Sequence, residues 1–199
     1  MGGYTAFFYG TLMAREILYR VCYGTSKVDD FPALKELASE LSIQPALLHN
    51  YCRHKVADAD YPAVIPQLGH TVRGTYVTGL TDTDVTHLDR FEGSEYTRKK
   101  VKVMILEDGQ EKGESVEAQT YVWSAPVARL EREEWDYDEF RREKMHRWTD
   151  ASEEYEGKQS LNIYLENGVS GAHDPTGGRA FAADLDVNDT QEEMLHAAA

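Results

Sequence analysis

The sequence has little of three things that mark particular classes of protein: cysteine, long apolar runs and positive charge. Its two cysteines, Cys22 and Cys52, are too few for a disulfide framework or a thiolate zinc site, so we expect a reducing, cytoplasmic compartment. No apolar run approaches the length of a membrane-spanning helix. The first residues carry no basic region ahead of an apolar one, which argues against a secretory signal.

Positive charge is scarce, because 21 lysines and arginines stand against 35 aspartates and glutamates, for a net charge of −14. Nucleic-acid binding requires a basic surface that neutralises phosphates, so we expect no nucleic-acid partner. The same charge argues against an anionic membrane surface. Apolar residues make up 41% of the 199 positions, which is enough for a core. The expected partner is a small-molecule substrate, and either a monomer or a homodimer fits the composition.

The chain opens with a strand–turn–helix corner. Residues 4–9 are short, apolar and aromatic, which predicts a buried strand. Gly10 interrupts this strand, and Thr11 is expected to cap a helix over about 12–22. Glycine lets the backbone approach a ligand closely, and free N–H groups at a helix start favour an anion or a developing oxyanion. The alternative is an ordinary tight turn.

The next stretch contains an insertion between core elements, at about 25–45. A helix is expected from Pro32, and its apolar spacing favours a role in extending the core over covering the mouth of a site. Residues 46–56 predict a strand, residues 57–66 a loop leading into a short apolar piece, and residues 72–80 a second strand. No metal site is predicted in the loop, because the acids there lack the glycine and distal glutamate of a calcium motif.

A second corner is a helix followed by a strand. Thr81 or Asp82 can cap the helix, with Asp84 in its first turn, and Gly93 is typical of a left-handed residue at a helix end. Residues 97–106 alternate as a strand does.

Glu92 therefore falls at a helix-to-strand junction. The negative end of the helix dipole, together with burial, would raise its pKa toward that of a general base. Arg98 could pair with a carboxylate here and lower that pKa, so the sequence leaves the direction open. The alternative is that Glu92 is one solvated acid among 35.

The remaining chain predicts a hairpin, a charged helix and a tail. A loop at 107–114 joins the strand over 97–106 to a return strand over 115–124. A helix over 134–148 should pack an apolar stripe on the core. Residues 1–150 are expected to form one domain, and residues 151–199 an acidic extension, part of which could be ordered against the core.

Three motifs in order carry a family resemblance: Tyr9-Gly10-Thr11-Leu12, then 60–65, then 88–98 with Glu92, Gly93, Tyr96 and Arg98. Over about 4–148 the chain resembles the γ-glutamylcyclotransferase-like superfamily. It is most similar to the branch of plant avirulence-induced proteins and their fungal relatives. The resemblance implies an α+β fold, a mostly antiparallel small β-barrel with peripheral helices.

The resemblance also implies site residues. Glu92 would be the catalytic acid/base. Gly10, Thr11 and Leu12 would cradle the substrate carboxylate or carbonyl, and Tyr96 would wall or hydrogen-bond the glutamyl group. The loop around Pro62 matches a pocket-lining loop more loosely, and Tyr121 is a weaker candidate. The substrate-binding residues implied in full are Tyr9, Gly10, Thr11, Leu12, Pro62 and Tyr96.

The implied activity is an intramolecular cyclisation of a γ-glutamyl substrate, releasing 5-oxoproline and an amine without metal or cofactor. Two alternatives remain open. One is a non-catalytic small-molecule-binding or regulatory module on the same fold, and the other is an acid/base enzyme acting on another compound in a specialised pathway. The insertion and the tail lie outside the minimal family pattern and could reshape the pocket, so they put the substrate in doubt more than the reaction.

Overall fold

A ring of β-strands forms the centre of the protein. The computed structural model describes residues 3–113, 115–149 and Thr176. The strands are β1 (Tyr4–Phe8), β2 (Ser42–Lys55), β3 (Pro62–Leu80), β4 (Tyr96–Glu107), β5 (Gln110–Glu111) and β6 (Val116–Trp123). They follow the order β2-β3-β1-β6-β4-β5, and a further pairing of β2 with β4 closes the ring. Only the β1–β6 pairing is parallel among the described strands, so the predicted α+β class with mostly antiparallel pairing is confirmed.

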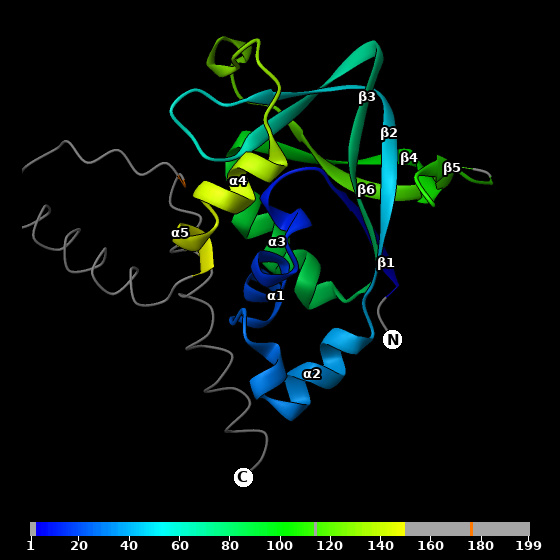
Figure 1. The fold of residues 1–199 in the computed structure, drawn as a ribbon, viewed down its shortest axis with the longest axis vertical. Helices are drawn as coiled ribbons and strands as arrows, with labels where there is room; N and C mark the ends of the chain where they lie inside the picture. Colours follow the sequence, from blue (N-terminus) through cyan, green and yellow to red (C-terminus); the bar gives the residue numbers. More distant parts are fainter. Residues whose placement is uncertain (1–2, 114, 150–175, 177–199) are drawn as a thin grey trace, which may run out of the picture.

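The helices gather on one side of the strands, to the left of and below them in Figure 1. They are α1 (Arg15–Tyr23), α2 (Pro32–Ser39), α3 (Asp82–Glu92), α4 (Tyr137–Glu143) and α5 (His146–Thr149). The described ranges also contain four short 3-10 turns, of which η2 (Val28–Asp30) connects two helices and the others connect a strand and a helix: η1 (Thr11–Met13), η3 (Gly93–Glu95) and η4 (Val127–Arg129). No helix in the described ranges has the length and apolar character that crossing a membrane requires.

Among the residues that the structure describes, the core consists of two apolar clusters, and β1 contributes to both. Phe7 and Tyr9 belong to a cluster whose other members are strand residues, whereas Ala6 and Phe8 belong to the cluster shared with the helices. This split follows from the alternation of side chains along a strand. As a result β1 is buried on both sides, and its end brings Tyr9 and Gly10 to the boundary between the strand ring and the helices.

Helix α3 begins and ends largely as its sequence predicts. The Thr81 hydroxyl accepts a hydrogen bond from the Asp84 N–H, and the Asp84 carboxylate accepts one from the Thr81 N–H, which completes a capping box. Gly93 ends the helix with a φ of 65° and a ψ of −161°, so its φ is positive but its conformation is not left-handed helical. The Leu88 and Phe91 side chains are buried and anchor the helix, which leaves Glu92 at its last position.

The first corner differs from the prediction. Thr11 does not cap a helix: Gly10 precedes the short turn η1 without a side-chain cap, and α1 begins only at Arg15. The Met13 N–H bonds to the Gly10 carbonyl at 3.0 Å, so the chain turns tightly before the helix starts. The Thr11 side chain is buried and is therefore packed into the corner, where it makes no cap.

Three further predictions need correction. Helix α2 forms as expected but does not extend the core, because Ala38 is its one buried residue and Leu37 is 47% exposed. The piece around Pro62 is the start of the long strand β3, paired with β2, so the loop ends earlier than predicted. The helix predicted over 134–148 is two helices, α4 and α5. Phe140 and Trp148, which belong to the predicted apolar stripe, are buried as expected.

The predicted extension over 151–199 lies outside the described residues except for Thr176, which is buried.

Candidate functional site

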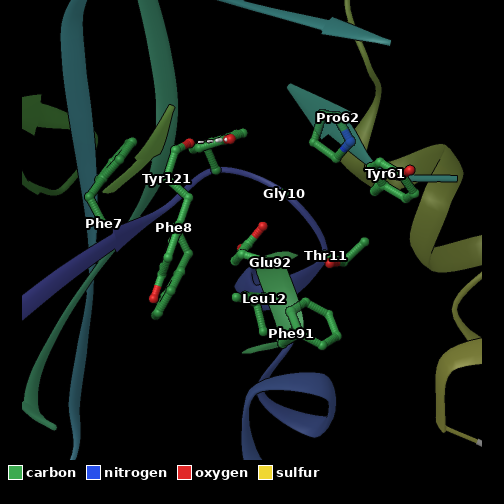
Figure 2. A pocket seen from close by; sticks show the side chains of 11 residues that line it. Phe7, Phe8, Gly10, Thr11, Leu12, Tyr61, Pro62, Phe91, Glu92 and Tyr121 are labelled. Atoms are coloured by element: carbon green, nitrogen blue, oxygen red, sulfur yellow. Dashed lines mark hydrogen bonds between the residues drawn. The ribbon is translucent and has the colours of Figure 1, made fainter. Parts of the chain in front are cut away.

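A pocket joins the two corners that the sequence singles out. Its wall is formed by Phe7, Phe8, Tyr9, Gly10, Thr11, Leu12, Tyr61, Pro62, Phe91, Glu92 and Tyr121. In Figure 2 the chain arches from Phe8 through Gly10 to Thr11, and the Glu92 side chain rises from the end of α3 into the space beneath this arch. Glu92 is half-buried and lines the pocket. The separate segments 9–12 and 92 therefore share one site.

Glycine is required at position 10 by the approach of the β3 segment. A Cβ atom on Gly10 would lie 2.8 Å from Pro62 Cγ and 2.9 Å from Pro62 Cδ, closer than such atoms normally come. The absence of a side chain lets Gly10 pack directly against the Pro62 ring. The two segments of the pocket wall are thus in direct contact, backbone against ring.

The arch offers unpaired backbone donors. Within the described part of the chain, the N–H groups of Gly10, Thr11 and Leu12 have no hydrogen-bond acceptor. All three residues line the pocket. Unpaired N–H groups that face a pocket are suited to an anionic or carbonyl oxygen of a ligand.

Tyr121 on β6 forms another part of the pocket wall. The Tyr121 hydroxyl donates to Asp89 Oδ1 at 2.8 Å, and burial, this hydrogen bond and the nearby charge of Glu92 raise the pKa of Tyr121 well above 10.0. The hydroxyl therefore stays protonated at neutral pH and remains a donor. Tyr121, a weaker candidate from the sequence, is part of the pocket wall.

Arg98 pairs with Asp89. Its Nε lies 2.8 Å from Asp89 Oδ1, and its Nη2 lies 3.1 Å from Asp89 Oδ2. This two-pronged contact uses both carboxylate oxygens. Asp89 is not among the site residues that the sequence predicts, and the structure makes it the residue that connects the Tyr121 hydroxyl to Arg98 and to helix α3.

Tyr96 is the one predicted site residue that does not line the pocket. Its side chain is buried, and its hydroxyl donates to the Pro62 carbonyl at 2.8 Å. Tyr96 thus stabilises the position of Pro62, at the start of β3, without lining the pocket itself. The other predicted residues, Tyr9, Gly10, Thr11, Leu12, Pro62 and Glu92, are brought together at the pocket.

Tyr61 is held on two sides. Its hydroxyl donates to Glu95 Oε2 at 3.0 Å, and Glu95 in turn pairs with Arg129. Its ring packs edge-on against the Trp148 ring of α5, with ring centroids 6.5 Å apart. The Trp148 ring also packs against the Phe91 ring, with a centroid separation of 6.1 Å. Trp148 therefore contacts two residues of the pocket wall, Tyr61 and Phe91.

Asp60 links the same segment to the last helices. Its buried carboxylate lies 3.2 Å from Arg147 Nη1 and 3.9 Å from Lys144 Nζ. Its carbonyl accepts a 2.8 Å hydrogen bond from Trp135 Nε1. Sequence reasoning missed Arg147 and Trp135, and no local pattern signals them, because their partners lie 87 and 75 residues away.

These features define a small α+β protein whose pocket holds one carboxylate opposite a glycine arch with unpaired amides. The family model described as gamma-glutamyl cyclotransferase, AIG2-like, matches residues 6–150. The chain belongs to this family.

Similar proteins are found in plants. Protein AIG2 B from Arabidopsis thaliana is 32% identical over 126 residues, covering 62% of this chain and 72% of that protein. AIG2-like protein D from the same plant is 27% identical over 160 residues, covering 80% of this chain and 92% of that protein. A solution structure of another A. thaliana protein has a TM-score of 0.50 at 24% identity and covers 84% of this chain and 87% of that one. This last match bears on the fold alone.

Proposed function

We propose that the protein cyclises a γ-glutamyl substrate, releasing 5-oxoproline and a free amine, with Glu92 as the general acid/base. The observation that carries this proposal is the shared pocket, in which the half-buried Glu92 faces the arch with the unpaired amides of Gly10, Thr11 and Leu12. Membership of the gamma-glutamyl cyclotransferase, AIG2-like family supports the same reaction class.

The substrate supplies the nucleophile. The α-amine of a γ-glutamyl group can fold back on its own γ-carbonyl and close a five-membered ring, so the protein needs no serine or cysteine nucleophile. Holding the substrate in this folded form removes the conformational entropy that the glutamyl chain would otherwise lose on reaching the reactive geometry, an effect worth several kcal/mol. The aromatic walls of Tyr61, Phe91 and Tyr121 would exclude extended conformers of the glutamyl chain.

Glu92 would move one proton twice. Its carboxylate first takes a proton from the α-ammonium, and the free amine then attacks the γ-carbonyl carbon to form a C–N bond and an oxyanion. In this intermediate the ring nitrogen still carries two protons and a positive charge. The protonated Glu92 next gives its proton to the departing nitrogen as the original amide C–N bond breaks, and the ring nitrogen loses its second proton to the released amine or to solvent, which leaves the lactam of 5-oxoproline. The unpaired amides of the arch would stabilise the oxyanion or anchor the α-carboxylate.

The test is the Glu92→Gln variant, which keeps the shape of the side chain and removes its basicity. We expect it to abolish 5-oxoproline release, measured by mass spectrometry across γ-glutamyl amino acids, γ-glutamyl amines and glutathione. Glu117→Gln is the matched control, because Glu117 is exposed on β6 and does not line the pocket. Turnover retained in Glu92→Gln would remove Glu92 from the acid/base role.

The same panel of compounds distinguishes the proposed cyclisation from the two alternatives, a non-catalytic binding module and a different acid/base reaction. If the wild-type protein binds a γ-glutamyl compound or 5-oxoproline but releases no product from any of them, the fold serves as a binding module. If a product other than 5-oxoproline appears and depends on Glu92, the site performs different acid/base chemistry.

A further inference from the structure

Arg53 reaches from β2 to the point where β1 leaves the sheet. The last β1–β3 pair is Phe8 with Thr75, so Tyr9 is the first residue beyond this pairing. Arg53 Nη1 donates to the Tyr9 carbonyl at 2.9 Å and lies 3.4 Å from the Arg73 carbonyl on β3. The guanidinium therefore bridges the two carbonyls at the fork between these strands.

The Arg53 side chain is fixed in this position. It is 11% exposed, its Nη2 lies 3.0 Å from Glu134 Oε1, and its guanidinium carbon lies 5.5 Å from the centre of the Trp135 ring. An arginine held by an ion pair, an aromatic ring and two carbonyls has little freedom to reorient. It is consequently a rigid donor to the Tyr9 carbonyl.

The direction of the Tyr9 carbonyl sets the direction of the next N–H. A trans peptide is planar, so its C=O and N–H point to opposite sides, and no cis peptide occurs in the described chain. Arg53 does not line the pocket, whereas Gly10 does. With its carbonyl drawn to Arg53, the Tyr9–Gly10 peptide presents the unpaired Gly10 N–H on the pocket side.

We propose that Arg53 is a positioning residue that aims the Gly10 N–H into the pocket by holding the Tyr9 carbonyl. The proposal rests on the function proposed above in one respect: the oxygen that this N–H receives belongs to a γ-glutamyl substrate or to 5-oxoproline. Arg53 itself touches no substrate atom. Its contribution is preorganisation, because a donor already aimed at the oxygen needs no rearrangement when charge develops there.

The experiment compares Arg53→Met, Arg53→Lys and Arg73→Met. Arg73 is an exposed arginine on β3, so Arg73→Met makes the same chemical change close by while keeping the backbone carbonyl that Arg53 contacts. We expect Arg53→Met to lower kcat for 5-oxoproline release by about 10- to 100-fold, less than the roughly 100- to 1000-fold loss seen when one oxyanion donor is removed, because the Gly10 N–H is still present and has only lost its fixed direction. Arg53→Lys should recover part of this loss, because an ammonium can still donate to the Tyr9 carbonyl. Arg73→Met should stay within about twofold of wild type.

A second measurement needs no turnover. Amide NMR of the full chain follows the assigned Gly10 N–H while 5-oxoproline is added. The Gly10 resonance of the wild type and of Arg73→Met should shift with saturation, and in Arg53→Met its free position should change and its response to 5-oxoproline should shrink.

The two proposals fail in different ways. A wild type without turnover, whose Gly10 resonance still depends on Arg53 and responds to 5-oxoproline, ends the cyclisation proposal and keeps the Arg53 inference. A Gly10 resonance that ignores 5-oxoproline, or that is unchanged in Arg53→Met, overturns the Arg53 inference. The same holds if Arg53→Met lowers thermal stability while kcat and KM stay at wild-type values, because Arg53 then serves only to satisfy buried carbonyls.

Discussion

The hydroxyl of Tyr121 on β6 donates a 2.8 Å hydrogen bond to Asp89 Oδ1 on α3, and this bond joins one wall of the pocket to the helix that carries Glu92. Asp89 and Glu92 are three residues apart and so lie on neighbouring parts of the same helix surface. The Tyr121 ring and the Glu92 carboxylate are thereby fixed relative to each other through a single helix turn. This relationship gives two predictions.

The first prediction concerns Tyr121→Phe, which keeps the ring in the wall and removes the hydrogen bond. We expect the free energy of unfolding to fall by about 1.5 kcal/mol, the lower end for a hydrogen bond to a charged group, since Asp89 keeps its pairing with Arg98. Urea unfolding measures the change. Tyr51→Phe is the control, because the Tyr51 hydroxyl has no hydrogen bond within the described residues, and it should change stability by less than about 0.5 kcal/mol. Equal effects of the two substitutions would contradict the prediction.

The second prediction concerns alkaline pH. The pKa of Tyr121 is raised above 10.0 in the folded protein, first by burial, so above about pH 10 the unfolded chain loses this proton before the folded one does. The folded state then binds more protons than the unfolded state, and the free energy of unfolding falls as the pH rises. The Tyr121 contribution is complete below about pH 10 and is lost progressively above it.

The measurement compares wild type with Tyr121→Phe by urea unfolding between about pH 8 and about pH 11. The stability difference between the two proteins should be constant at the lower end and shrink as the pH rises. Other groups, including Tyr23, whose pKa burial also raises, titrate alike in both proteins and cancel in the comparison. A difference that is independent of pH would show that Tyr121 ionises in the folded protein as it does in the unfolded chain.

Local features of this fold follow from the sequence. The spacing of Thr81 and Asp84 predicts the start of α3, and Gly93 predicts its end, because both act within one helical turn. The turn at Gly10 is also predicted, although not the short η1 that replaces the start of a helix there. Glu92 and the Tyr9–Leu12 corner could thus be named as candidate site residues from short motifs taken together with the family resemblance that they carry.

Contacts between residues that lie far apart in the chain cannot be predicted from local sequence patterns. The contact of Arg53 with the Tyr9 carbonyl depends on where β1 separates from β3, and the contact of Tyr121 with Asp89 depends on strand and helix ends meeting in space. The predicted helix over 134–148 fails for a similar reason. The N–H groups of Lys144 and Met145 both bond to the Phe140 carbonyl, which ends α4 and lets α5 place Trp148 against the pocket wall. Tertiary packing here overrides the helical period.

The third prediction concerns the buried Asp60 carboxylate, whose side chain is 6% exposed beside Arg147 and Lys144. Asp60→Asn removes the negative charge but keeps the shape of the side chain. Arg147 and Lys144 then face a neutral amide in place of a carboxylate. We expect a loss of about 2 kcal/mol, less than for a fully buried pair because the cations are partly solvated. Thermal or urea unfolding measures it.

Asp29→Asn is the matched control for Asp60→Asn. Asp29 lies 3.0 Å from Lys35 Nζ, but both side chains are mostly exposed. Exposed ion pairs contribute little, so this variant should stay within about 0.5 kcal/mol of wild type. If Asp60→Asn is equally mild, the link between the last helices and the pocket segment does not depend on charge.

The last prediction is a double-mutant cycle between Gly10 and Pro62. In Gly10→Ala the new Cβ would lie 2.8 and 2.9 Å from two ring carbons of Pro62, so either the arch or the start of β3 must move. Overpacking of this kind costs about 1–3 kcal/mol and should also lower turnover, since both segments line the pocket. Pro62→Ala removes these two ring carbons, Cγ and Cδ. The double variant should therefore be more stable than the sum of the single changes predicts, by at least about 1 kcal/mol. Urea unfolding of the four proteins gives this coupling, and additive single effects would mean that the Gly10–Pro62 contact does not set the packing of the arch.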